Sequence, residues 1–96
     1  MKPSESLAKH REEVLEIIAK YPVSNPRVFG SVARGEDVEG SDIDIMVDHG
    51  GDLSLMHLAR MEIELATKLN VPVGVHTTAE FGPKATARLM SDLRSL

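Results

Sequence analysis

The chain has 96 residues, 42% hydrophobic and 27% charged, which is typical of one ordinary globular domain, and we expect residues 1–96 to form it. Cysteine is absent, so disulfides and thiol chemistry are excluded and a reducing, cytoplasmic location is expected. The formal net charge is −4, and only one Tyr and two Phe occur, so no direct nucleic-acid binding is expected. No apolar run approaches the roughly 18 residues of a membrane-spanning helix, so no membrane segment is expected either.

Helices and short strands alternate along the chain. The spacing of apolar residues, with capping and turn residues, predicts in chain order a helix over residues 4–20, a strand over 27–29, a helical turn over 31–35, a strand over 42–47, a helix over 53–69, a strand over 71–77 and a last helix to about residue 94. This order predicts an α/β (α+β) fold, with a small mixed three-stranded sheet and helices packed on one of its faces. We expect the other face to be partly open.

The most informative stretch reads VFGSVARGEDVEGSDIDIMVD and spans residues 28–48. Asp42 and Asp44 are two residues apart on a predicted strand, so their side chains leave the same face, while Ile43 and Ile45 point into the core. Two adjacent carboxylates repel each other, and Asp is depleted in strands, so a bound cation would offset the cost. A hard divalent cation held by oxygen ligands, Mg²⁺, fits best. The alternative is a solvated acidic face on an edge strand.

A Gly-Ser pair precedes the two aspartates. Gly30 and Ser31 follow the first predicted strand and open a helical turn, where free backbone N–H groups and a hydroxyl can bind phosphate. The alternative for Ser31 is a helix N-cap. Arg34 lies one turn later and could contact the triphosphate or the acceptor, or else form a surface ion pair with Glu36 or Asp37. With the carboxylates, this turn indicates a site for a nucleoside triphosphate and magnesium.

Three short segments carry a resemblance to a known family: Gly30-Ser31, Ala33-Arg34-Gly35 and Ser41-Asp42-Ile43-Asp44. Together they resemble the signature of the minimal nucleotidyltransferases, small stand-alone members of the DNA polymerase beta-like superfamily. The resemblance covers nearly the whole chain. It implies transfer of a nucleoside monophosphate, above all AMP, from a magnesium-bound triphosphate (ATP or another NTP) to a protein hydroxyl.

The same resemblance implies residue roles and a partner. Asp42 and Asp44 would be the catalytic residues that hold the metal, and Gly30, Ser31 and Arg34 would bind the nucleotide. Many members resemble antitoxins paired with HEPN-domain toxins, so a HEPN-domain protein is the expected partner. No segment remains to build an acceptor-binding domain, so the acceptor must belong to another molecule docked over the open face. The sequence is compatible with oligomers.

One departure from the family pattern concerns the strand after the long helix. Relatives usually carry a third carboxylate there, in a pattern like Val-Asp-Leu-Val-Thr, whereas residues 73–77 read VGVHT and place Gly74 where the Asp would be. The resemblance implies that this Asp helps to bind a second metal and to activate the attacking group. Glu62 or His76 could act in its place, or could be an ordinary boundary and surface residue. The alternative function is therefore a catalytically weakened antitoxin that neutralises its partner by binding.

Overall fold

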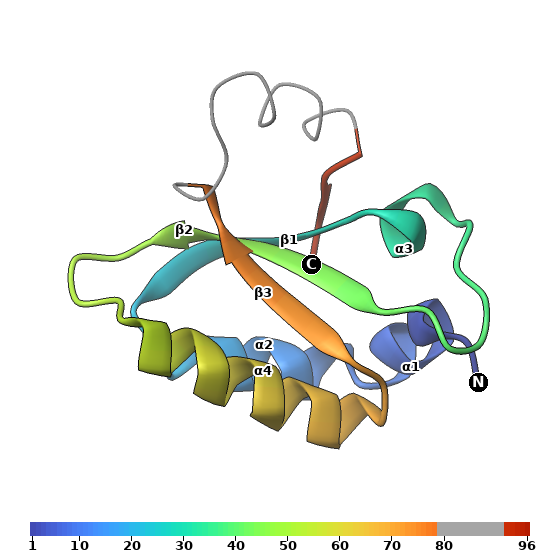
Figure 1. Ribbon diagram of the computed structural model, residues 1–96, viewed down its shortest axis with the longest axis horizontal. Coiled ribbons are helices and arrows are strands. Elements are labelled where there is room, and N and C mark those ends of the chain that lie inside the picture. The colour runs from blue at the N-terminus through green and yellow to red at the C-terminus, as the bar shows by residue number, and fades with distance from the viewer. Residues whose placement is uncertain (79–91) are drawn as a thin grey trace.

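A computed structural model of the chain describes residues 1–78 and 92–96 (Figure 1). Its strands form one mixed sheet in the order β3-β2-β1-β4, in which β1 is antiparallel to β2 and β4, and β2 is parallel to β3. The strands are β1 (Val23–Phe29), β2 (Ile43–His49), β3 (Val73–Thr77) and β4 (Arg94–Ser95). The helices are α1 (Pro3–Lys9), α2 (Arg11–Ala19), α3 (Ser31–Arg34) and α4 (Leu55–Leu69).

The predicted fold class is confirmed, since α1, α2 and α4 lie together on one face of a mixed sheet (Figure 1). The sheet has four described strands rather than three. The prediction that the last helix runs to about Arg94 is wrong at its end, because Arg94 and Ser95 form β4 and pair with Val28 and Arg27 of β1. The rest of that predicted helix, up to residue 91, falls mainly outside the described residues.

The boundaries of the helices follow from their terminal residues. Helix α4 begins after Ser54, whose side chain accepts a hydrogen bond from the backbone N–H of His57, and it ends at Asn70 in the left-handed conformation (φ 57°). The helix predicted over 4–20 is divided into α1 and α2, because His10 departs from helical geometry (φ −111°, ψ 21°).

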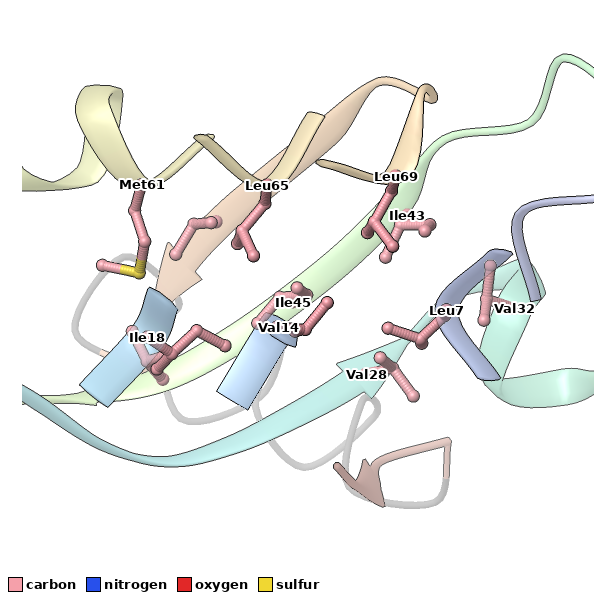
Figure 2. Packing of buried hydrophobic residues seen from close by; sticks show 12 residues of the cluster. Leu7, Val14, Ile18, Val28, Val32, Ile43, Ile45, Met61, Leu65 and Leu69 are labelled. Atoms are coloured by element: carbon pink, nitrogen blue, oxygen red, sulfur yellow. The ribbon is translucent and has the colours of Figure 1, made fainter. Parts of the chain in front are cut away.

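Apolar side chains from the helices and from one face of the sheet form a single core (Figure 2). On β2 the predicted alternation is confirmed, since Ile43, Ile45 and Val47 are fully buried against the helices. Figure 2 shows Leu65 of α4 pointing toward Ile45, and Met61 of the same helix pointing toward Ile18 of α2. Each such side chain contributes about 1.5–3 kcal/mol through its burial, so this packing fixes which face of β2 is turned away from the helices.

The opposite face of the sheet carries Asp44, one of the predicted site residues. The strand register places Phe29 and Gly74 on either side of Asp44, and Arg27 and His76 on either side of Met46. This face is only partly open, because Phe29 and Met46 are buried. Within residues 1–78 and 92–96, no helix has the length and apolar character needed to cross a membrane.

Candidate active site

Asp44 lies at the centre of the candidate site, on β2 between β1 and β3. Two glycines flank it. A Cβ atom added at Gly30 would lie 3.0 Å from Asp44 Oδ2, and one added at Gly74 would lie 3.5 Å from Asp44 Oδ1. Gly30 also has φ 75° and ψ −153°, a backbone conformation that is essentially restricted to glycine. The backbone of both neighbouring strands therefore approaches the Asp44 carboxylate closely.

Asp42 lies just before β2, and its side chain is exposed, whereas the Asp44 side chain is 36% exposed. Burial raises the pKa of Asp44 above its usual value, the neighbouring His76 imidazole opposes this shift, and the negative charge of Asp42 adds to it. The Asp42 carboxylate thus lies close enough to destabilise the ionised form of Asp44. A bound cation would relieve that repulsion.

His76 occupies the space above Gly74. Its Nε2 atom lies 3.7 Å from Asp44 Oδ1, and a Cβ atom added at Gly74 would lie 3.0 Å from that nitrogen. The imidazole also meets the Phe29 ring edge-on, with ring centroids 5.6 Å apart and planes at 64°. The His76 ring, rather than a carboxylate, is thus the polar group that β3 places beside Asp44.

Two other carboxylates that lie near the sheet have different partners. Glu62 Oε2 accepts a hydrogen bond from the backbone N–H of Val75, at 2.8 Å. Asp48, four residues beyond Asp44, accepts a hydrogen bond from the guanidinium of Arg27 at 2.5 Å. The structure therefore places His76 beside Asp44, with Asp42 close enough to influence the pKa of Asp44, and it directs Glu62 to the backbone of Val75.

The two carboxylates Asp42 and Asp44 fit a divalent cation that is also bound by the phosphates of a substrate. In the part of the chain that the structure describes, no three His, Asp or Glu side chains come close enough together to hold a metal ion alone. Magnesium is commonly bound by one or two carboxylates together with the phosphates of a substrate, rather than by a complete protein cage. Asp42 and Asp44 supply such a pair.

The Gly-Ser turn has the geometry that the motif predicted, with one difference. Gly30 itself is the N-cap residue of α3, and Ser31 is the first helical residue, so the N-cap alternative for Ser31 is wrong. Arg34, whose side chain is 42% exposed, forms ion pairs with Glu36 at 3.1 Å and Asp92 at 3.2 Å. Sequence reasoning anticipated Glu36 and missed Asp92, because the pairing of β4 with β1 brings this distant residue to α3.

Comparison with known proteins agrees with this geometry. A nucleotidyltransferase domain model matches residues 7–96. A Methanocaldococcus jannaschii protein, provisionally named a protein adenylyltransferase, is 35% identical over 82 residues, which cover 85% of this chain and 88% of that protein. A solved structure provisionally named a minimal nucleotidyltransferase superimposes with a TM-score of 0.87 at 33% identity, covering 97% of this chain and 95% of that one.

Fold and site together define a nucleotidyltransferase. The chain belongs to the nucleotidyltransferase domain family, so the resemblance to the minimal nucleotidyltransferases and the prediction of an enzyme of this class are confirmed. The fold alone is also shared with a solved complex of tri-AMPylated Shewanella oneidensis HEPN toxin with MNT antitoxin, with a TM-score of 0.70 at 14% identity over 92% of this chain and 69% of that one.

Proposed function

We propose that the chain transfers AMP from ATP to a hydroxyl group of a HEPN-domain partner protein, and that it acts as the antitoxin of such a pair. The observation that carries this proposal is the position of the Asp44 carboxylate beside the Gly30-Ser31 turn, with Asp42 two residues earlier in the chain. A phosphate-binding turn and a carboxylate pair at this separation suit a magnesium-bound triphosphate.

Each residue has a defined part in this proposal. Asp42 and Asp44 hold Mg²⁺, which when bound neutralises charge on the phosphates and lowers the pKa of the attacking hydroxyl. The backbone after Gly30 and the hydroxyl of Ser31 bind the terminal phosphates. Arg34 exchanges its exposed ion pairs for a phosphate, which costs little because surface ion pairs are weak.

The reaction itself is a displacement at the α-phosphorus. The acceptor oxygen forms a bond to that phosphorus, the bond to the bridging oxygen breaks, and pyrophosphate leaves while the hydroxyl proton passes to a base or to water. The names of the relatives support AMP as the transferred group and a HEPN toxin as the acceptor, since one relative is provisionally a protein adenylyltransferase and one structural neighbour contains an AMPylated HEPN toxin.

A second candidate function is supported by Gly74. Because β3 provides no carboxylate beside Asp44, the chain could have lost transfer and neutralise its partner by binding alone. This alternative predicts a stable complex in which the partner carries no nucleotide.

A labelling experiment separates the two functions. The purified chain is mixed with a HEPN-domain protein encoded beside it, magnesium and ATP labelled at the α-phosphate. We expect label on the partner with the parent chain, and loss of label to background with Asp42→Asn/Asp44→Asn. Asp48→Asn is the matched control, because Asp48 is a carboxylate of the same strand that is paired with Arg27. A complex that forms without label would establish the binding function instead, and equal labelling by the double variant would refute the roles of the two aspartates.

A further inference from the structure

The loop of residues 36–42, which joins α3 to β2 and ends at Asp42, buries a charged side chain. Asp37 is 5% exposed, whereas its neighbour Val38 is 62% exposed, the reverse of what side-chain polarity favours. A buried carboxylate needs a specific partner, and the backbone N–H of Ser4 donates to Asp37 Oδ2 at 2.8 Å. The loop is therefore attached to the first turn of α1, which it passes in Figure 1.

The helix to which the loop is attached is itself fixed to the rest of the molecule. Leu7 of α1 packs in the core, and the Ser6 hydroxyl donates a buried hydrogen bond to the Leu69 carbonyl at the end of α4. The amino group of Met1, just before α1, also pairs with Glu39 of the loop, at 3.0 Å. Helix α1 thus provides a fixed point for the loop.

The chain between Asp37 and Asp42 is closed into a turn. The Val38 N–H donates to Ser41 Oγ, and the Ser41 N–H donates to the Val38 carbonyl, both at 3.0 Å. Asp42 follows this turn directly, and β2 begins at the next residue. Asp42 therefore lies between two anchors, the Asp37 contact before it and strand β2 after it.

We propose that Asp37 is a positioning residue for the cation site, because by fixing the loop to α1 it holds Asp42 where it can share a divalent cation with Asp44. This inference rests on the proposed function, which assigns the cation to these two aspartates. Asp42 is exposed, so packing of its own side chain does little to fix it. When only a fraction of the molecules has the arrangement that binds, the apparent affinity falls by that fraction, so a contact that favours this arrangement strengthens cation binding.

Calorimetry with magnesium tripolyphosphate tests the effect on affinity. Asp37→Ala should weaken binding by about tenfold or more, the lower end of what indirect partners of metal sites contribute. Glu39→Gln is the matched control, because it removes a carboxylate from an exposed position of the same loop and should change the affinity by about threefold or less. Ile18→Val, a core substitution in α2, controls for lost stability and should leave the affinity unchanged. Undiminished binding by Asp37→Ala, or an equal loss in Ile18→Val, would overturn the proposal.

The same titration of Asp42→Asn/Asp44→Asn keeps this inference apart from the proposed function. If the double variant loses binding and Asp37→Ala does not, the positioning role is refuted and the assignment of the cation to the two aspartates stands. If the double variant binds like the parent chain, the assignment of the cation is refuted, and the positioning role with it.

Amide exchange supplies a test that requires no variant. Ser4 is the second residue of α1, so its N–H has no acceptor within the helix, and its protection from exchange reports the Asp37 contact. Coupling is reciprocal, so if the contact favours cation binding, cation binding must favour the contact. We expect exchange at the Ser4 amide, followed by NMR, to slow by a comparable factor when the parent chain is saturated with magnesium tripolyphosphate. An unchanged rate would overturn the proposal, because a contact that only stabilises the fold does not respond to the cation.

Discussion

Gly30 and Gly35 flank the same short helix α3, yet a side chain would meet different surroundings at each position. Both have positive φ, 75° and 71°. At Gly30 a Cβ atom would lie 3.0 Å from Asp44 Oδ2, so this carboxylate would have to shift slightly, whereas nothing lies within 4 Å of one at Gly35. Comparing alanine substitutions at Gly30 and Gly35 therefore separates the effect of backbone strain from the effect of disturbing Asp44.

Gly30→Ala should lower the free energy of unfolding by about 1–3 kcal/mol, because its backbone conformation is essentially restricted to glycine. It should also weaken magnesium-supported ATP binding, because Asp44 must move. Gly35→Ala should lower the free energy of unfolding by about 1–2 kcal/mol through left-handed strain and should retain binding. Urea unfolding and calorimetry measure the two effects. If both variants lost ATP binding equally, the contact between Gly30 and Asp44 would have no part in the site.

Gly74 allows a test of the missing carboxylate. It lies outside the left-handed region, since the positive φ values among the described glycines belong to residues 30, 35 and 40, so an aspartate there would not strain the backbone. Gly74→Asp alone crowds His76, whereas Gly74→Asp/His76→Ala provides room for the new side chain.

We expect this double variant to transfer AMP faster with Mg²⁺ than the parent chain in single-turnover assays. An added carboxylate that also acted as a general base would contribute about 10²–10⁴-fold. Circular dichroism checks that the variant is folded, and His76→Ala serves as the control. A folded double variant that is no faster than the parent would show that the third carboxylate is dispensable in this chain.

The sequence predicts part of this site well. Two-residue alternation places Asp44 opposite the core, and the Gly-Ser turn follows from local backbone chemistry. The position of His76 over Gly74 depends on a side-chain rotamer and on the register between β2 and β3, neither of which is encoded in local spacing. The parity of residues 74 and 76 indicates only that they share a face.

A hydrogen bond joins the first turn of helix α1 to the loop that follows α3. The backbone N–H of Ser4 donates a hydrogen bond to Asp37 Oδ2 at 2.8 Å, and Asp37 is buried. Burial alone would raise the pKa of Asp37, but the backbone and side-chain hydrogen bonds of Ser4 outweigh it and lower that pKa. Asp37 therefore stabilises the N-terminus of α1 in its ionised form.

Because the pKa of Asp37 is lower in the folded state, the direction in which its contribution to the free energy of unfolding changes with pH is fixed. The contribution of Asp37 is complete above its unfolded pKa of about 3.9, and it is lost as the pH falls through the lower folded value. Asp37→Asn should lower the free energy of unfolding near neutral pH by about 0.5–2 kcal/mol, as the loss of a helix cap does, and should flatten the acid limb of the stability curve. Urea titrations across acidic pH measure this.

Glu39→Gln is the control for that prediction, because Glu39 forms an exposed ion pair with the Met1 amino group that solvent and salt screen. It should change the acid limb less than Asp37→Asn does. An unaltered acid limb in Asp37→Asn would mean that the Ser4 contact does not stabilise the fold.

The sequence predicts an element correctly where its pattern of apolar residues is long, and misses it where that pattern is short. Helix α4 and strand β2 carry clear periods of 3.6 and two residues. Strand β4 has two residues, which show no period, and only its pairing with β1 reveals it. Strand β1 begins at Val23, four residues before its predicted start, because Asn25 (φ 51°) and Pro26 resemble a connector while forming an irregular part of the strand.

The core joins elements that are distant in the chain. Leu65 of α4 is fully buried against the sheet, and Ser6 of α1 donates a hydrogen bond to the Leu69 carbonyl at the end of α4, at 2.7 Å. We propose that residues 1–96 unfold as one cooperative unit. Circular dichroism and the fluorescence of Tyr21, the only tyrosine, should then give the same transition.

Leu65→Ala should lower the free energy of unfolding by about 2–5 kcal/mol, because it leaves a cavity in the core. Ile63→Ala, two residues earlier on the same helix, should change it by about 0.5 kcal/mol or less, because Ile63 is 67% exposed. Urea denaturation of both variants measures the difference. Equal losses in the free energy of unfolding would show that Leu65 does not lie on the face of α4 that packs against the sheet.

Glu62 has a consequence for the behaviour of the protein in concentrated solution. Strand β3 lies at one edge of the described sheet, and unpaired backbone groups at such an edge can act as a template for strand addition by another chain, which begins aggregation. The Glu62 carboxylate already occupies the N–H of Val75, in the middle of that edge. An incoming strand would have to displace this charged side chain from Val75, which disfavours strand addition along β3.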